Sequence, residues 1–346
     1  MFKRRWDSDG GGFGIFDRGR SVFSGLLEDK RRSRRWRCQA FGGGWVLCGK
    51  RAGVECDVLG GFAGSAWWDT RDWDRKKSGI WAICVGGNGV GDGNGRTWMR
   101  YRVAYGSRMG VKRKVNQDAL LVKCGVCEGE SVVLAVVCDG MGGLRKGEVA
   151  SAVVVRAFAQ WFERELPVVL MCGCMGEKVF DSWEKMIQEV HRRIWIYGEK
   201  GGFEMGTTLT AMLFWRAEYY VAQVGDSRAY QVSDKVLQLT EDQTWVERQV
   251  LLGRMSRDKA MGDGRRNILL QCVGASREVK AVYKKGEVQK NVIYLICSDG
   301  FWRGIEEREF LRGKREVFLR RWIQKMLWQS QKRGERDDAS AIVISI

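Results

Sequence analysis

Proline and histidine are almost absent from this chain, which has one of each in 346 residues. No apolar run reaches the roughly 18 residues that indicate a membrane-spanning helix, so no membrane partner is expected. The first 20 residues are charged and glycine-rich and lack the apolar segment of a secretory signal. The 11 cysteines lie mostly in apolar stretches, which favours reduced, buried thiols in a cytoplasmic protein.

The scarcity of histidine also argues against a zinc site. Two cysteine pairs have short spacings, Cys124 with Cys127 and Cys172 with Cys174, but neither has a matching Cys or His pair at finger spacing. The single histidine, His191, lies in an amphipathic helical pattern away from every motif. We interpret it as a helix-surface or core residue rather than a general base.

The charge balance is strongly basic, at +17, with a pI near 9.5. Such a charge would suit a nucleic-acid partner or a membrane surface. The basic residues are spread along the chain, however, so a generally basic composition is the favoured explanation. A nucleic-acid binder is therefore the less favoured alternative, supported by net charge alone.

Residues 1–98 differ from the rest of the sequence. They are rich in glycine, tryptophan and arginine, and no helical or strand period lasts beyond a few residues. We expect this stretch to be disordered, or to be a mis-called upstream extension of a protein that starts at Met99. A genuine basic N-terminal extension is the competing interpretation. A single functional domain is predicted over residues 99–346.

One stretch organises that domain, Ser131–Ala150, with the sequence SVVLAVVCDGMGGLRKGEVA. Its apolar, β-branched beginning predicts a strand buried on both faces. The strand meets Asp139 and Gly140, and a helical pattern begins at Gly147. A carboxylate at the end of a buried strand is costly unless a cation takes up its charge. The glycines after it allow a sharp turn and close approach to a ligand.

The remaining patterns predict many antiparallel strands with helix pairs inserted between them. We expect a helix from Gly147 to Leu166 that Pro167 ends, and another over about 181–197. A strand is predicted at 268–273 among several others. This order favours an α+β fold, an α-β-β-α sandwich of two mostly antiparallel sheets flanked by helices.

Three carboxylates share the same position relative to predicted strands. Asp139 and Asp299 each end a buried strand, and Asp337 precedes the last strand. If they gather at one edge of the sandwich, they repel one another unless divalent cations lie between them. Oxygen ligands without His or Cys favour Mg²⁺ or Mn²⁺ over zinc. Two such ions about 4 Å apart can hold a bridging hydroxide for phosphoryl displacement.

Residues 99–346 resemble the metal-dependent serine/threonine protein phosphatases of the type 2C (PPM) family, particularly the bacterial branch. The resemblance rests on seven blocks in family order: GVKRKVNQDA, VVCDGMGG followed by GEVAS, GTTLTA, VGDSRAY, LTEDQT, ICSDGFW and RDDASAIVI. It implies hydrolysis of phosphoserine and phosphothreonine on proteins by a water that bridges two Mn²⁺ or Mg²⁺ ions, with no phosphoenzyme.

The resemblance also implies roles for individual residues. Asp139 would bridge both metals, the Gly140 carbonyl would bind one, and Asp299 with Asp337 would complete the other. Asp226 would bind a weaker third metal, and Arg113 would bind the substrate phosphate through its planar guanidinium. Two residues would lie in or next to the metal shell: Asp118 and Asn116.

Several departures from the family pattern, among them Leu144 in place of a common histidine, are not expected to inactivate the enzyme, although the loss of a charge at Gln117 would weaken metal affinity. Gln117 replaces a glutamate, Met141 stands where animal members have a histidine, and Gln243 replaces a histidine common in bacterial members. The alternative function is a catalytically silent regulatory or binding module. The preferred interpretation is a monomeric cytoplasmic enzyme that acts on the phosphorylated protein substrates of a cytoplasmic serine/threonine kinase.

Overall fold

The structure is a computed structural model that describes residues 36–41, 44–49, 78–85, 101–111, 113–127, 130–141, 146–171, 175–314 and 318–346. Within residues 1–98 it describes only three strands, β1 (Trp36–Phe41), β2 (Gly44–Gly49) and β3 (Ser78–Val85). The remainder of that stretch lies outside the described residues. The expectation that residues 1–98 are disordered or mis-called therefore stays a prediction, as does the domain boundary at Met99.

Two sheets form the centre of the molecule, and every neighbouring pair of strands in them is antiparallel. The six-stranded sheet has the order β10 (Val236–Gln238), β9 (Arg228–Val232), β12 (Ile293–Cys297), β13 (Ala339–Ser345), β4 (Tyr101–Arg108) and β3. The five-stranded sheet has the order β11 (Val282–Glu287), β8 (Glu218–Val224), β7 (Leu209–Trp215), β6 (Glu130–Asp139) and β5 (Asp118–Cys127).

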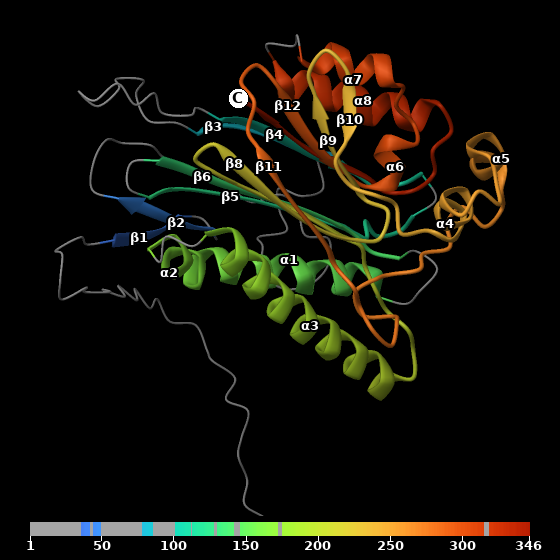
Figure 1. Cartoon of the computed structure of the whole chain (residues 1–346), viewed down its shortest axis with the longest axis horizontal. Coiled ribbons are helices and arrows are strands. Elements are labelled where there is room, and N and C mark those ends of the chain that lie inside the picture. The colour runs from blue at the N-terminus through green and yellow to red at the C-terminus, as the bar shows by residue number, and fades with distance from the viewer. Residues whose placement is uncertain are drawn as a thin grey trace, which may run out of the picture.

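Helices cover the outer face of each sheet, as Figure 1 shows. The five-stranded sheet packs against α1 (Gly147–Arg164), α2 (Leu166–Met171) and α3 (Met175–Gly201). The six-stranded sheet packs against α6 (Asp299–Trp302), α7 (Glu307–Lys314) and α8 (Leu319–Lys332). Two short helices, α4 (Trp245–Leu251) and α5 (Arg257–Gly262), lie in the connection from β10 to β11. The predicted α-β-β-α sandwich is confirmed.

Strand β6 shows how the sequence builds these layers. Val133 and Val137 face the other sheet, whereas Leu134 and Val136 pack under the helices of the five-stranded side. All four side chains are fully buried. A strand with alternate side chains in two apolar layers must be apolar along its whole length, which explains the unbroken run in the sequence. The strand ends where Asp139 meets the edge of the sandwich.

Two local predictions were wrong. Pro167 does not end the long helix; α1 ends at Arg164, and Pro167 is the second residue of α2. Proline is tolerated there because the first backbone N–H groups of a helix have no partner within it. The stretch 268–273 forms only isolated bridges, Thr244 to Leu269 and Thr207 to Val273. Strand β11 lies at one edge of the five-stranded sheet, and its exposed, lysine-containing sequence resembles a loop.

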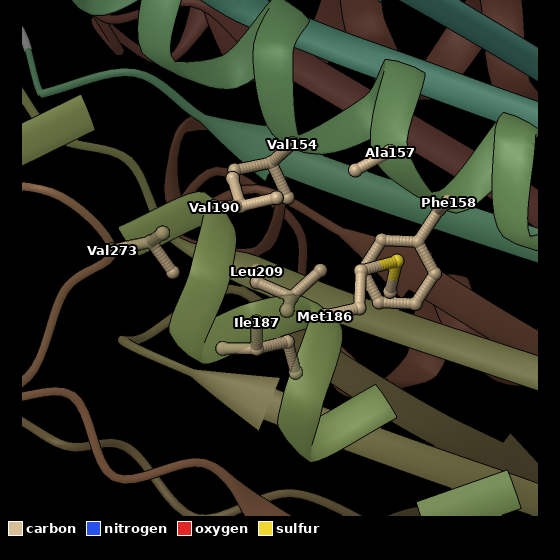
Figure 2. A pocket seen from close by; sticks show the side chains of 8 residues that line it. All are labelled: Val154, Ala157, Phe158, Met186, Ile187, Val190, Leu209 and Val273. Atoms are coloured by element: carbon tan, nitrogen blue, oxygen red, sulfur yellow. The ribbon is translucent and has the colours of Figure 1, made fainter. Parts of the chain in front are cut away.

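A gap between α1, α3 and the sheet is lined by apolar side chains alone (Figure 2). Its lining combines Val154 and Phe158 of α1 with Ile187 and Val190 of α3 and with Leu209 of β7. Because no polar group is available to orient a ligand, we interpret this gap as core packing rather than a binding site.

Candidate metal centre

The predicted carboxylates meet at one edge of the sandwich because four strand ends meet there. Asp118 begins β5 and lies opposite Asp139, which ends β6. Asp299 follows β12 and Asp337 precedes β13, and these two strands are also neighbours. Asp226 lies in the turn from β8 to β9, which links the two sheets. The fold thus places five sequence-distant aspartates at one edge.

Crowding is visible in the electrostatics of Asp139. Burial raises the pKa of its carboxyl well above the ordinary value, and four neighbouring carboxylates raise it further: Asp118, Asp299, Asp337 and Asp226. Like charges that share a buried site cannot all ionise without a cation. This edge therefore favours either bound protons or bound metal ions.

Two carboxylate oxygens at this edge are buried and have no hydrogen-bond partner among the described residues, Asp118 Oδ1 and Asp299 Oδ1. The other oxygen of Asp118 accepts a hydrogen bond of 2.9 Å from the Ser298 hydroxyl. Both residues are less than 10% exposed. A buried carboxylate oxygen without a partner costs free energy, and such oxygens are good ligands for a hard divalent cation.

Two arginines form ion pairs with carboxylates of this edge. Arg113 donates from Nε and Nη2 to Asp337 Oδ1 at 3.1 and 2.5 Å, and from Nη1 to Gln117 Oε1 at 3.1 Å. Arg303 lies within ion-pair distance of Asp299 Oδ2, at 2.8 Å, and of Asp226 Oδ2, at 3.4 Å. Arg303 was not predicted from the sequence. The signal available was a basic residue one helical turn after Asp299.

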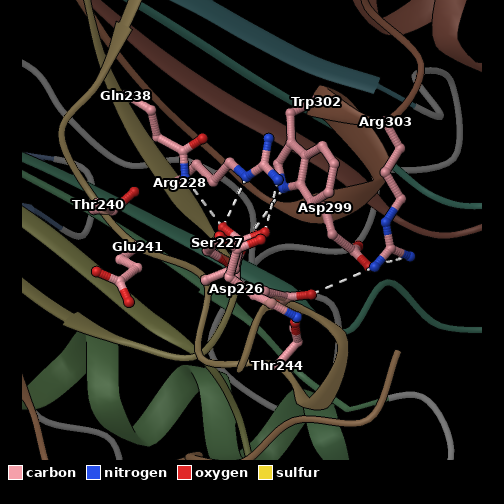
Figure 3. Close-up of polar contacts among 12 residues, drawn as sticks. Asp226, Ser227, Arg228, Gln238, Thr240, Glu241, Thr244, Asp299, Trp302 and Arg303 are labelled. Carbon is pink, nitrogen blue, oxygen red and sulfur yellow. Dashed lines mark hydrogen bonds and ion pairs between the residues drawn. The ribbon is translucent and has the colours of Figure 1, made fainter. Parts of the chain in front are cut away.

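Asp226 is fixed by the turn that carries it (Figure 3). Gly225 before it has φ of +101°, and a Cβ there would lie 2.7 Å from the Thr208 side chain. Behind the turn, Arg228 forms a bidentate ion pair with Asp242, at 2.8 and 2.7 Å. Trp302 donates its indole N–H to the Asp226 carbonyl at 3.1 Å. Asp226 is therefore a buried, positioned carboxylate rather than a solvated turn residue.

Asp338 was also not predicted as a functional residue. Its carboxylate accepts the backbone N–H groups of Gly110 and Gln117, each at 2.8 Å. These two residues lie on either side of Arg113 in the sequence. Asp338 therefore fixes the segment that carries the residue predicted to bind phosphate. Asn116 supports the same region, since its Oδ1 accepts the Asp118 N–H at 3.0 Å and its Nδ2 donates to Ser107.

The backbone of Asp139 is held by a pair of threonines that lie just before β7. The Thr208 hydroxyl accepts the Asp139 N–H, and the Thr207 hydroxyl donates to the Asp139 carbonyl, both at 2.9 Å. Next to it, a Cβ at Gly140 would lie 2.5 Å from Gly147 backbone atoms and 2.6 Å from the Gln117 carbonyl oxygen. Only glycine fits where these three segments cross.

His191 lies on α3 in the core and takes no part in this edge. It is 5% exposed, and its Nδ1 accepts the backbone N–H of Gly274 at 3.1 Å. Burial lowers the pKa of the imidazole below its ordinary value. The ring thus joins α3 to the loop that follows Val273 and has no access to the carboxylates.

Across the described residues, no group of three or more acidic, histidine or cysteine side chains is arranged to hold a metal ion as it stands. The chemistry of the donors nevertheless suits a hard divalent cation, because Asp118 and Asp299 each offer a buried oxygen without a partner and the carboxylates contain no nitrogen or sulfur donor. In the part of the chain that the structure describes, no helix is both long and apolar enough to cross a bilayer.

Comparison with known families matches residues 106–338 to the protein phosphatase 2C model. A serine/threonine phosphatase of Listeria monocytogenes is 35% identical over 194 residues, which span 53% of this chain and 73% of the relative. The phosphatase PstP of Mycobacterium tuberculosis is 26% identical over 252 residues, which span 72% of this chain and 46% of that protein.

Solved structures of bacterial serine/threonine phosphatases have the same fold. The serine/threonine phosphatase Stp1 from Staphylococcus aureus superposes with a TM-score of 0.62 at 24% identity, covering 70% of this chain and 94% of its own. The catalytic domain of PstP, in complex with two manganese ions, gives a TM-score of 0.59 at 26% identity, covering 71% and 97%. This chain belongs to the protein phosphatase 2C family, a family of serine/threonine phosphatases, and the resemblance inferred from its seven motifs is confirmed.

Proposed function

We propose that this chain hydrolyses phosphoserine and phosphothreonine on proteins, with two Mn²⁺ or Mg²⁺ ions and a water between them as the nucleophile. Asp139, Asp299 and Asp337 would hold the ions together with the Gly140 carbonyl. Bound there, the ions would lower the pKa of a water and draw charge from the phosphoryl group. The observation that carries this proposal is the cluster of five aspartates at one edge, in which Asp118 and Asp299 each have a buried oxygen without a partner among the described residues.

The chain's own residues bind the substrate and support the ligands. Arg113 would bind two phosphate oxygens through its guanidinium fork, exchanging the Asp337 oxygen that it contacts for substrate. About a quarter of the Arg113 side chain is exposed (26%), so a substrate can reach it. Asp118 and Asn116 would support the ion-binding carboxylates from behind, because Asp118 faces Asp139 across the strand pair.

The substrates would be phosphorylated proteins made by a serine/threonine kinase, in the cytoplasm, with the phosphatase acting as a monomer over residues 99–346. The names of the Listeria and Mycobacterium relatives and the family match at 106–338 support phosphorylated proteins as the substrates. The departures at Gln117 and Gln243 are compatible with it. Gln117 contacts Arg113, and Gln243 accepts the Gly225 N–H, so both have positions in the site's scaffold.

Hydrolysis of a phosphothreonine peptide with Mn²⁺, and again with EDTA, tests the proposal. We expect activity only with the metal, and a fall of kcat/KM by about a thousandfold or more in Asp139→Ala, which corresponds to ~4 kcal/mol of transition-state stabilisation. Asp181→Ala, an exposed aspartate on α3, is the matched control and should keep wild-type activity. Turnover that survives both EDTA and Asp139→Ala refutes the mechanism. A wild-type chain that binds Mn²⁺ without hydrolysing any phosphopeptide would instead be a silent module.

A further inference from the structure

Arg303 is a cation placed inside the acidic cluster by the chain itself. It follows the single turn of α6, so its guanidinium returns towards Asp299 at the start of that turn. The distances are 2.8 Å to Asp299 Oδ2 and 3.4 Å to Asp226 Oδ2, and the Arg303 side chain is 16% exposed. Figure 3 shows the guanidinium beside the Asp299 carboxylate, with a dashed line that joins it to Asp226. One arginine thus bridges two aspartates that lie far apart in the sequence.

The arginine is held in this position by its neighbours. Trp302 packs its ring against both Arg303 and Arg228, with guanidinium-to-ring distances of 5.2 and 3.4 Å. The same indole donates to the Asp226 carbonyl. The guanidinium of an arginine stays protonated in proteins. Arg303 is therefore a permanent charge at a fixed place.

We propose that the Arg303 guanidinium neutralises Asp226 and Asp299 in place of a third divalent cation, so that this chain binds two metal ions and not three. The inference rests on the two-ion site of the proposed function and assigns Asp226 to an internal ion pair. It replaces the expectation, drawn from family resemblance, that Asp226 binds a weaker third metal.

A third cation would be costly at this edge. It would have to displace the Arg303 guanidinium from both Asp299 and Asp226, and the displaced arginine would leave its carboxylate partners.

Asp299 can serve both partners at once. Its Oδ2 is held by Arg303, whereas its Oδ1 is buried without a partner among the described residues. One carboxylate can thus accept the guanidinium with one oxygen and a metal ion with the other. In our proposal the Asp226 carboxylate pairs with Arg303 and binds no metal ion.

Counting the Mn²⁺ ions bound per chain by native mass spectrometry, after equilibration with excess Mn²⁺ and removal of free metal, tests the inference. We expect two ions in the wild type and two in Asp226→Asn. Arg303→Gln should bind a third ion, and the double variant Arg303→Gln with Asp226→Asn should return to two. Arg192→Gln, which removes an exposed arginine paired with Glu189, is the matched control and should bind two.

Thermal unfolding in EDTA gives an independent readout. Arg303→Gln should lower the Tm of the metal-free protein and show a larger rise of Tm on adding Mn²⁺ than wild type, because two buried carboxylates lose their counter-ion. Arg303→Lys keeps the charge and should behave like wild type in ion count, which covers the case in which the glutamine variant does not fold.

The outcomes separate the two proposals. A wild-type chain that hydrolyses the phosphopeptide but binds three ions, with Asp226→Asn reduced to two, overturns the role of Arg303 and leaves the phosphatase function intact. An active wild type with two ions, and no gain of a third in Arg303→Gln, overturns it as well. A wild type that binds no Mn²⁺ and hydrolyses nothing overturns the proposed function, and this inference with it.

Discussion

The two halves of the acidic edge balance their charges differently. On the five-stranded sheet, Asp118 and Asp139 face each other across β5 and β6, and the Asp118 side chain accepts a hydrogen bond from the Ser298 hydroxyl. On the six-stranded side, Asp299 and Asp337 each have an arginine. Among the described residues, ion pairs reach the second half of the edge and not the first.

This contrast indicates which carboxylates need a bound cation most. Carboxylates that already pair with a guanidinium lose less when no metal is bound, whereas Asp118 and Asp139 must take up protons or metal ions. Burial raises the pKa of both, and in Asp118 the nearby Asp338 adds to it. We infer that metal ions stabilise the five-stranded half most, and that substitutions in the two halves affect the metal-free protein in opposite directions.

The strongest test of the contrast compares Asp299→Asn with Asp139→Asn in EDTA. Asp299→Asn should lower the free energy of unfolding by about 3 kcal/mol, because it leaves the buried Arg303 without its closest partner. Asp139→Asn should raise it by ~1 kcal/mol, because it removes one of several crowded carboxylates. Urea unfolding followed by tryptophan fluorescence measures both. The contrast fails if the two variants shift stability in the same direction.

A second, smaller effect concerns Asp338, which connects the six-stranded half to the loop that carries Arg113. Asp338→Ala removes the acceptor of two backbone N–H groups and should lower the free energy of unfolding by about 2 kcal/mol. It should also raise KM for a phosphopeptide more than it lowers kcat, since Arg113 is no longer held in position. Asp338→Asn keeps one acceptor and should show a smaller effect on both. Wild-type KM in Asp338→Ala would contradict the clamp.

The smallest expected effect lies outside the acidic edge and serves as its reference. The pKa of His191 is lowered by burial, so the unfolded state binds a proton more readily than the folded state below about pH 6.5. Stability should therefore be lost as the pH falls below that value. Wild type should lose more stability than His191→Asn as the pH falls from about 7.5 to 5.5, in parallel urea titrations with the same metal concentration.

The comparison between wild type and His191→Asn isolates the imidazole, because both proteins share every carboxylate of the edge and the titration of those groups cancels. An equal loss in both would show that protonation of His191 does not oppose folding. Protonation of His191 must break the hydrogen bond that the Gly274 N–H donates to Nδ1, because an imidazolium has no acceptor nitrogen. An equal loss would therefore contradict a stabilising role for this hydrogen bond.

Much of the edge could be anticipated from sequence because its aspartates stand next to recognisable strands. Apolar, β-branched runs before Asp139 and Asp299 fix where the buried strands end, and the structure brings these residues together with Asp337, Asp226 and Asp118. Their roles as metal ligands remain predictions. Local patterns were less reliable where an element is short or exposed, as at α2 and β11.

Sequence by itself determined the layers of this protein, because buried strands and amphipathic helices have periods that can be followed along the chain. It also determined the family, through motifs in a fixed order. Only the tertiary structure decided which charges meet. Arg303 lies between Asp226 and Asp299, and Asp338 clamps the Arg113 loop, because separate connections of the two sheets converge at one edge. Charge pairing depends on distance in space, and separation along the chain does not encode it.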